Sequence, residues 1–138
     1  MATRDKLHDE ARRALENDGW TITDDPLVVR FGDTFGEIDL GAERLLGAEK
    51  GGKRIAVEVK SFLGTSMLSE FHTALGQYLN YREALARHQP GRRLYLAVSE
   101  DAYRAFFLQD IVQQILIRHQ VELIIFSIEQ EVIVTWKK

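Results

Sequence analysis

The stretch GEIDLGAERLLGAEKGGKRIAVEVKS, residues 36–61, alternates apolar and polar residues in a way that predicts consecutive β-strands. Residues 54–60 alternate with a period of two, so Glu58 and Lys60 project together from one face of the predicted strand. The opposite, buried face receives Ile55, Val57 and Val59. Just before this strand, the pair Gly51-Gly52 supplies the positive φ angles of a two-residue hairpin turn.

A shorter alternation precedes that turn. In residues 37–40, Ile38 and Leu40 are expected on the buried face, and Glu37 and Asp39 on the opposite face. Neighbouring strands of one hairpin would then bring Asp39 close to the polar face of the second strand. The sequence therefore predicts two carboxylates and a lysine in one neighbourhood.

These residue types suit a divalent metal and a polarised water. Mg²⁺ or Mn²⁺ would be bound by the carboxylates of Asp39 and Glu58, since hard cations prefer oxygen ligands, and the Val59 carbonyl could add a third oxygen. Lys60 would favour hydroxide and the negative charge that develops in a transition state. The alternative is a set of surface salt bridges on a half-exposed sheet.

The remaining sequence predicts a mixed α/β domain with helices packed on a central sheet. Asp18-Gly19 should end the first helix, and Ser66 should cap a long one whose apolar stripe comprises Met67, Leu68, Phe71, Leu75, Tyr78, Leu79 and Leu85. A kink is expected near Gln109. Helices are predicted over residues 5–17, 67–88 and 99–119, and further strands over 20–23, 27–31, 93–98, 121–128 and 131–136.

Composition narrows the class of protein. With 138 residues the chain is expected to form one domain, residues 1–138, and the lack of cysteine fits a cytoplasmic location. No apolar run approaches the ~20 residues of a membrane helix. The net charge of −3 argues against a simple electrostatic nucleic-acid binder, although a bound cation would offset carboxylates locally.

The order of a helix, Asp39, a hairpin, Glu58-Val59-Lys60 and a long helix resembles the PD-(D/E)XK metal-dependent phosphodiesterases. That resemblance implies an α/β fold with a restriction-endonuclease-like core, in which a central mixed β-sheet is flanked by helices. Gln77 and Tyr81 are four residues apart on one helix face, and in RecB-like nucleases such a pair lies beside the metal site. Without the resemblance, they could simply edge the apolar stripe of the helix.

The first helix offers a further candidate. Nucleases of this kind often carry His or Glu there, so the resemblance makes His8 a candidate metal ligand or phosphate contact, with Glu10 as the alternative. On the residues alone, His8 could equally be a partly buried helix histidine.

Longer segments resemble the XisH family along nearly the whole chain. They include residues 18–27 (DGWTITDDPL), 38–43 (IDLGAE), 55–62 (IAVEVKSF), 69–82 (SEFHTALGQYLNYR), 94–98 (LYLAV) and 131–136 (EVIVTW). The XisH family consists of cyanobacterial fdxN-element excision controlling factors with an endonuclease-like fold. This resemblance implies a DNA-associated protein that acts with a partner, XisI, to control site-specific excision of a DNA element by a separate recombinase complex.

Three functional hypotheses follow. The first is a regulator of excision with a potential metal-dependent nuclease site, in which Asp39, Glu58 and Val59 bind the metal and Lys60, Gln77 and Tyr81 assist catalysis. The second is a non-catalytic module that works by binding the XisI-type partner. The third is a toxin-like nuclease controlled by that partner. A homodimer through the apolar C-terminal strands is also possible.

Overall fold

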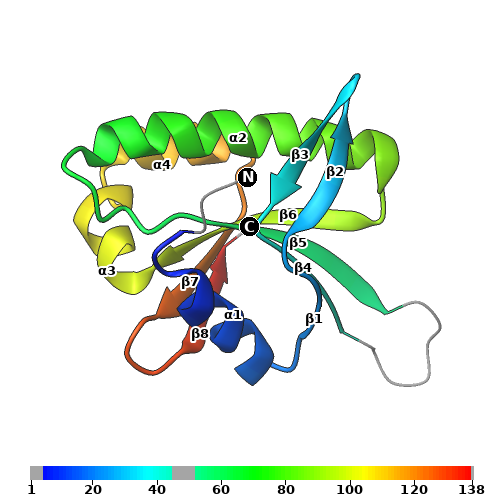
Figure 1. The fold of residues 1–138 in the computed structure, drawn as a ribbon. Coiled ribbons are helices and arrows are strands. Elements are labelled where there is room, and N and C mark those ends of the chain that lie inside the picture. Colours follow the sequence, from blue (N-terminus) through cyan, green and yellow to red (C-terminus); the bar gives the residue numbers. More distant parts are fainter. Residues whose placement is uncertain (1–4, 45–51, 138) are drawn as a thin grey trace.

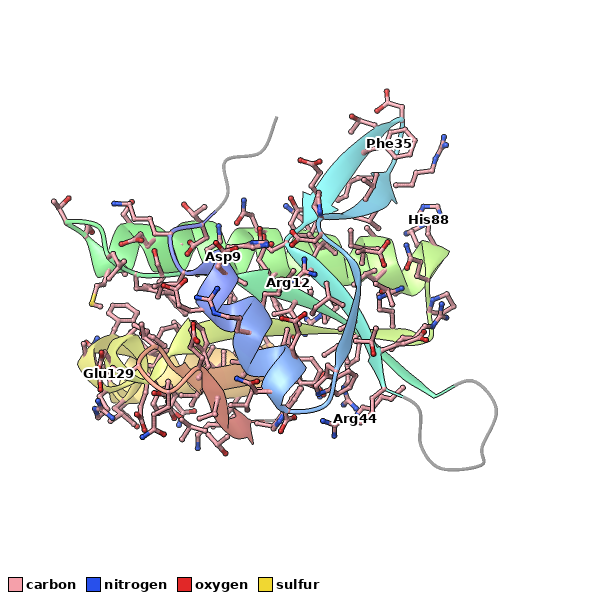
Figure 2. All side chains as sticks on the ribbon, turned by 60° about the horizontal axis from the view of Figure 1, so that its bottom comes forward. Asp9, Arg12, Phe35, Arg44, His88 and Glu129 are labelled. Carbon is pink, nitrogen blue, oxygen red and sulfur yellow. The ribbon has the colours of Figure 1, made fainter. Side chains whose placement is uncertain are left out.

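The protein, described by a computed structural model over residues 5–44 and 52–137, is built in three layers (Figure 1). The strands of the central sheet lie in the order β1-β4-β5-β6-β7-β8. Helices α2 and α4 cover one face and α1 covers the other (Figure 1), and α1, with Asp9 and Arg12, lies in front of the sheet in Figure 2. Each face carries its own apolar core.

The elements follow one another along the chain with short connections. The strands of the central sheet are β1 (Thr21–Asp24), β4 (Leu40–Arg44), β5 (Lys53–Val59), β6 (Arg92–Ser99), β7 (Leu123–Ser127) and β8 (Val132–Lys137). A separate hairpin consists of β2 (Leu27–Phe31) and β3 (Thr34–Ile38). The helices are α1 (His8–Asn17), α2 (Met67–His88), α3 (Glu100–Ala102), the π-helical turn η1 (Tyr103–Phe107) and α4 (Asp110–Arg118).

The sheet is mixed. β5, β6 and β7 are parallel, with α2 as the connection between β5 and β6, whereas β1, β4 and β8 join their neighbours in antiparallel pairs. Strand β6 is buried on both faces from Leu94 to Ser99, as its continuous apolar run predicts. The predicted α/β class, with a central mixed sheet flanked by helices, is confirmed.

Helix α1 buries Ala11, Ala14 and Leu15, but it begins at His8 and not at residue 5. Before it the chain forms a turn, in which the Asp5 side chain accepts a hydrogen bond from the Leu7 N–H at 2.9 Å and the Asp5 carbonyl accepts one from the His8 N–H at 3.1 Å. The predicted stop is confirmed, because the helix ends at Asn17 and Gly19 has a φ of 94°.

Helix α2 has its predicted bounds and its predicted cap, since Ser66 Oγ accepts from the Ser69 N–H. Its apolar stripe differs in three places. Leu68 is 56% exposed, and Ala74 and Ala84, both absent from the prediction, are buried. Helical periodicity defines which residues share a face, but it does not tell how far the neighbouring elements extend beneath the first turn.

The segment 37–40 is not one strand, which corrects the prediction. β3 ends at Ile38 and pairs with β2, while β4 begins at Leu40 and pairs with β5. Ile38 packs in the core beneath α2, and Leu40 packs in the core beneath α1. Asp39 is therefore the residue at which the chain passes from the hairpin into the central sheet.

The predicted turn at Gly51-Gly52 falls largely outside the described residues. β4 and β5 form an antiparallel pair, as predicted, in which Arg44 pairs with Lys53. The predicted kink near Gln109 is confirmed, since η1 ends at Phe107 and Gln109 is the N-cap of α4. In the described part of the chain, no helix is long and apolar enough to cross a membrane.

Candidate metal centre

Two carboxylates meet where β5 ends. Leu40 pairs with Val57, so the preceding residue on β4, Asp39, lies beside Glu58. The Asp39 N–H donates to Glu58 Oε1 at 3.2 Å, and the Val59 N–H donates to Asp39 Oδ2 at 2.7 Å. The structure thus brings together the acidic pair that the sequence predicted, through the antiparallel pairing of β4 with β5.

Glu58 is held in an environment that disfavours its charge. Its side chain is 3% exposed. Burial and then the neighbouring charge of Asp39 raise the pKa of Glu58 to about 9, against a smaller lowering effect of Lys60. At neutral pH the pair therefore requires either a proton or a cation to share the site.

Lys60 follows β5 directly and faces this pair. Its N–H donates to the Ala97 carbonyl at 3.0 Å, which ties the residue to β6. The next residue is tied as well, because the Ser61 N–H donates to Asp5 Oδ2 at 3.1 Å. Among the described residues, no carboxylate lies within ion-pair distance of the Lys60 amine, which leaves its charge available to the site.

Tyr81 reaches the site from α2. Burial raises the pKa of its phenol, and the charges of Glu58 and Asp39 raise it further. Gln77 lies one turn earlier on the same helix face, and its Oε1 is buried without a hydrogen-bond partner. A buried amide oxygen without a partner carries a desolvation cost, which a water or a bound group at this position would remove.

His8 contacts Asp25 and not the pair of Asp39 and Glu58. Its Nε2 contacts Asp25 Oδ1 at 2.7 Å, its Nδ1 is buried without a partner, and Arg12 also contacts Asp25. Within residues 5–44 and 52–137, no group of three or more His, Asp or Glu side chains is arranged to hold a metal ion. The structure therefore does not join His8, or the partly exposed Glu10, to the acidic pair in such a group.

Two aspartates near these residues were missed from the sequence. Asp5 fixes the chain just beyond Lys60, and Asp25 holds His8. Asp5 lies 56 positions before Ser61, so no local pattern could have identified that contact. The second is separated from His8 by 17 positions, and no local pattern connects them.

The donor set fits a hard, well-hydrated cation. Mg²⁺ is usually bound through one or two carboxylates while it keeps several waters, so the absence of a third acidic ligand among the described residues is no obstacle. Asp39 and Glu58 would supply the carboxylates, and the unpartnered Gln77 Oε1 is a candidate acceptor for a bound water.

The position of Tyr81 depends on Gly36. A Cβ atom at Gly36 would lie 2.8 Å from Tyr81 Cε1, closer than van der Waals contact allows. We expect Gly36→Ala to cost roughly 1–3 kcal/mol of stability by displacing the ring. Denaturant unfolding should show that cost in the natural background and a much smaller cost in a Tyr81→Ala background. Equal costs in both backgrounds would show that the ring contact is not the cause.

The fold and the site together define a mixed α/β protein with a buried acidic pair and a lysine at the end of a central strand. Comparison with known proteins places the chain more narrowly: it belongs to the XisH family, whose sequence model, described as XisH protein, matches residues 1–134. No curated protein matches the chain.

Two crystal structures are similar to it over almost their whole lengths. An XisH family protein from Nostoc punctiforme is 47% identical, with a TM-score of 0.88, and the match covers 96% of this chain and 98% of that one. An fdxN element excision controlling factor protein from Anabaena variabilis is 46% identical, with a TM-score of 0.86 and the same coverage.

Proposed function

We propose that this protein associates with DNA and controls excision of a DNA element, and that its acidic pair is a Mg²⁺ or Mn²⁺ site of the phosphodiesterase type. Family membership and the similar protein named as an fdxN element excision controlling factor support the regulatory role. The observation that carries the metal site is the burial of Glu58 against Asp39, with the pKa of Glu58 raised to about 9. Two adjacent buried carboxylates repel each other when both are ionised, and a bound cation stabilises that doubly ionised form.

Each residue has a defined part in this proposal. Asp39 and Glu58 would hold the cation. When bound, the cation would polarise a phosphoryl oxygen and lower the pKa of a water molecule. Lys60, whose amine has no carboxylate partner among the described residues, would stabilise hydroxide or the phosphate. Gln77 and Tyr81 would orient water and ligand from α2. Such a site would make the protein a DNA endonuclease with a restriction-endonuclease-like core.

A second candidate function has its own support. Asp39 accepts from the Val59 N–H and donates its own N–H to Glu58, so the pair also fastens the junction of β3 and β4 to β5. These residues would be retained as scaffold in a non-catalytic module that acts through a XisI-type partner and the recombinase complex. Metal binding distinguishes the two functions.

Thermal unfolding with and without saturating Mg²⁺ or Mn²⁺ tests the metal site. A ligand that binds only the native state adds about 2.7 kcal/mol at a hundredfold excess over its Kd, which corresponds to several degrees in Tm. The shift should be larger at about pH 9 than at about pH 6, because the proton on Glu58 competes with the cation.

Matched variants make this test specific. Glu58→Gln and Asp39→Asn should abolish the Tm shift. Glu83→Gln, which removes an exposed carboxylate on α2, should keep it. An unmoved wild-type Tm at both pH values, or an equal shift in Glu58→Gln, would refute the metal site.

A further inference from the structure

A second polar feature lies at the other end of β5. A cleft of about 1370 Å³ opens between the starts of β5 and β6, the carboxyl-terminal half of α2 and the end of α4. The carboxyl end of α2 and the starts of β5 and β6 lie on the same side of the molecule (Figure 1). Glu58 is four positions beyond Arg54, which lines the cleft, so the cleft begins about 13 Å from the acidic pair along the strand.

The cleft is strongly basic although the whole chain carries a net charge of −3. One carboxylate, Glu122, lines it, against six cationic side chains. These are Lys53, Arg54, Arg82, Arg92, Arg93 and Lys137.

Two of the six cations, Arg93 and Arg92, already interact with other groups of the protein. Arg93 forms an ion pair with Glu122 at 2.6 Å. Arg92 is 7% exposed and donates to the Ile55 carbonyl and to Gln89, so it fastens the strands. Neither is needed to bind a ligand.

The other four cations have no carboxylate partner in the described structure, and two are held in place. Arg82 lies over the Tyr78 ring at 5.3 Å and donates to the carbonyls of His119 and Gln120 at the end of α4. Lys137 lies over the Tyr103 ring at 5.6 Å. A cationic side chain that is already held over an aromatic ring loses less conformational entropy on binding an anion than a freely rotating one does.

The dimensions select the kind of anion. Pockets for small ligands have volumes of about 300–1,000 Å³, and this cleft is both larger and open to solvent. Its unpaired cations come from three different elements, β5, α2 and β8. Spaced cations that each meet one phosphate are the pattern of a nucleic-acid backbone contact.

We propose that this cleft binds the sugar-phosphate backbone of a nucleic acid, at a site separate from the acidic pair and independent of any metal. The protein then holds nucleic acid at two places along one strand of its sheet. The inference does not depend on catalysis at Asp39 and Glu58. It would survive if that site proved to be scaffold alone.

Fluorescence anisotropy with labelled single- and double-stranded DNA of about 20 nucleotides, in EDTA and over a series of salt concentrations, tests the cleft. The triple variant Lys53→Gln/Arg54→Gln/Lys137→Gln should bind at least tenfold more weakly at low salt. The slope of log K against log salt should fall by about 2–3, since each lost phosphate contact removes about 0.7–0.9.

A control of equal charge is available outside the cleft. Arg30, Arg87 and Arg104 are exposed and do not line it, so the triple change of these residues to Gln should leave affinity within about twofold. Circular dichroism should confirm that both triples are folded. The proposal fails if wild type does not bind DNA, if both triples lose affinity equally, or if the cleft triple binds like wild type.

An acidic peptide is the competing occupant. If polyglutamate binds in a cleft-dependent way and DNA does not, the cleft recognises an acidic protein and the nucleic-acid proposal is overturned. Cleft-dependent binding of DNA but not of polyglutamate supports it.

Discussion

Replacing Glu58 with glutamine should make the metal-free protein more stable at alkaline pH and leave its stability nearly unchanged near pH 4. The pKa of Glu58 is raised to about 9 in the folded protein, chiefly by burial and then by Asp39, whereas the unfolded chain has the ordinary value of 4.5. Between these values the unfolded state releases a proton that the folded state retains. Stability therefore falls as pH rises, by about 1.4 kcal/mol per pH unit.

Glutamine has the shape of the protonated acid and does not titrate, so the variant should lack this slope. At pH about 8, roughly 3.5 pH units above the unfolded pKa, we expect Glu58→Gln to gain roughly 4–5 kcal/mol over wild type. Urea unfolding in EDTA from about pH 4 to pH 9 measures both curves. Parallel curves, or a variant that is less stable than wild type at high pH, would contradict the raised pKa.

Saturating Mg²⁺ provides the complementary result. In wild type the cation should recover the stability lost at high pH, because it stabilises the ionised form of Glu58. In Glu58→Gln it should recover nothing. Glu83→Gln, on the exposed side of α2, should follow wild type throughout. If Glu58→Gln is more stable than wild type only in the absence of metal, the buried acid lowers the stability of the metal-free protein. Such a cost is common at functional sites.

The sequence predicted the parts of the site that depend on local periodicity. The period-two alternation of β5 correctly set Glu58 opposite the faces of Ile55 and Val57, and helical spacing correctly put Gln77 and Tyr81 on one face of α2. Both patterns are fixed by backbone geometry within a few residues.

Features that depend on the path of the chain through space were not predictable in this way. Ile38 and Leu40 are two residues apart, a spacing that indicates a shared face, yet they pack in different cores because the chain changes sheets at Asp39. His8 meets Asp25 through tertiary contact alone. The basic cleft draws on α2, α4 and four strands, and its cations look like ordinary solvated residues in the sequence.

Changing Lys60 to alanine should reduce Mg²⁺-dependent DNA cleavage by roughly 10²–10³-fold, if the acidic pair is catalytic. Removal of one group that stabilises charge in a transition state typically costs that much. Its backbone contact to Ala97 does not involve the side chain, so the variant should keep its fold. The measurement is the rate of cutting of single- and double-stranded DNA at saturating Mg²⁺ or Mn²⁺.

Lys60 also lowers the pKa of Glu58, so its loss should weaken metal binding as well as chemistry. Saturating metal at about pH 9 separates the two effects, because there the metal site is filled in both proteins. A rate that recovers in Lys60→Ala under those conditions would assign the lysine to metal binding alone. Lys60→Arg keeps the positive charge and should retain more activity than Lys60→Ala.

DNA binding in EDTA separates a catalytic defect from a binding defect. Lys60→Ala should bind DNA like wild type while cutting it slowly, whereas the cleft triple should lose binding. If wild type does not cut any DNA, even with a XisI-type partner present, while it still binds DNA through the cleft, the acidic pair is a scaffold. The protein would then control excision by holding nucleic acid and its partner, and the endonuclease-like site would be a retained structural feature.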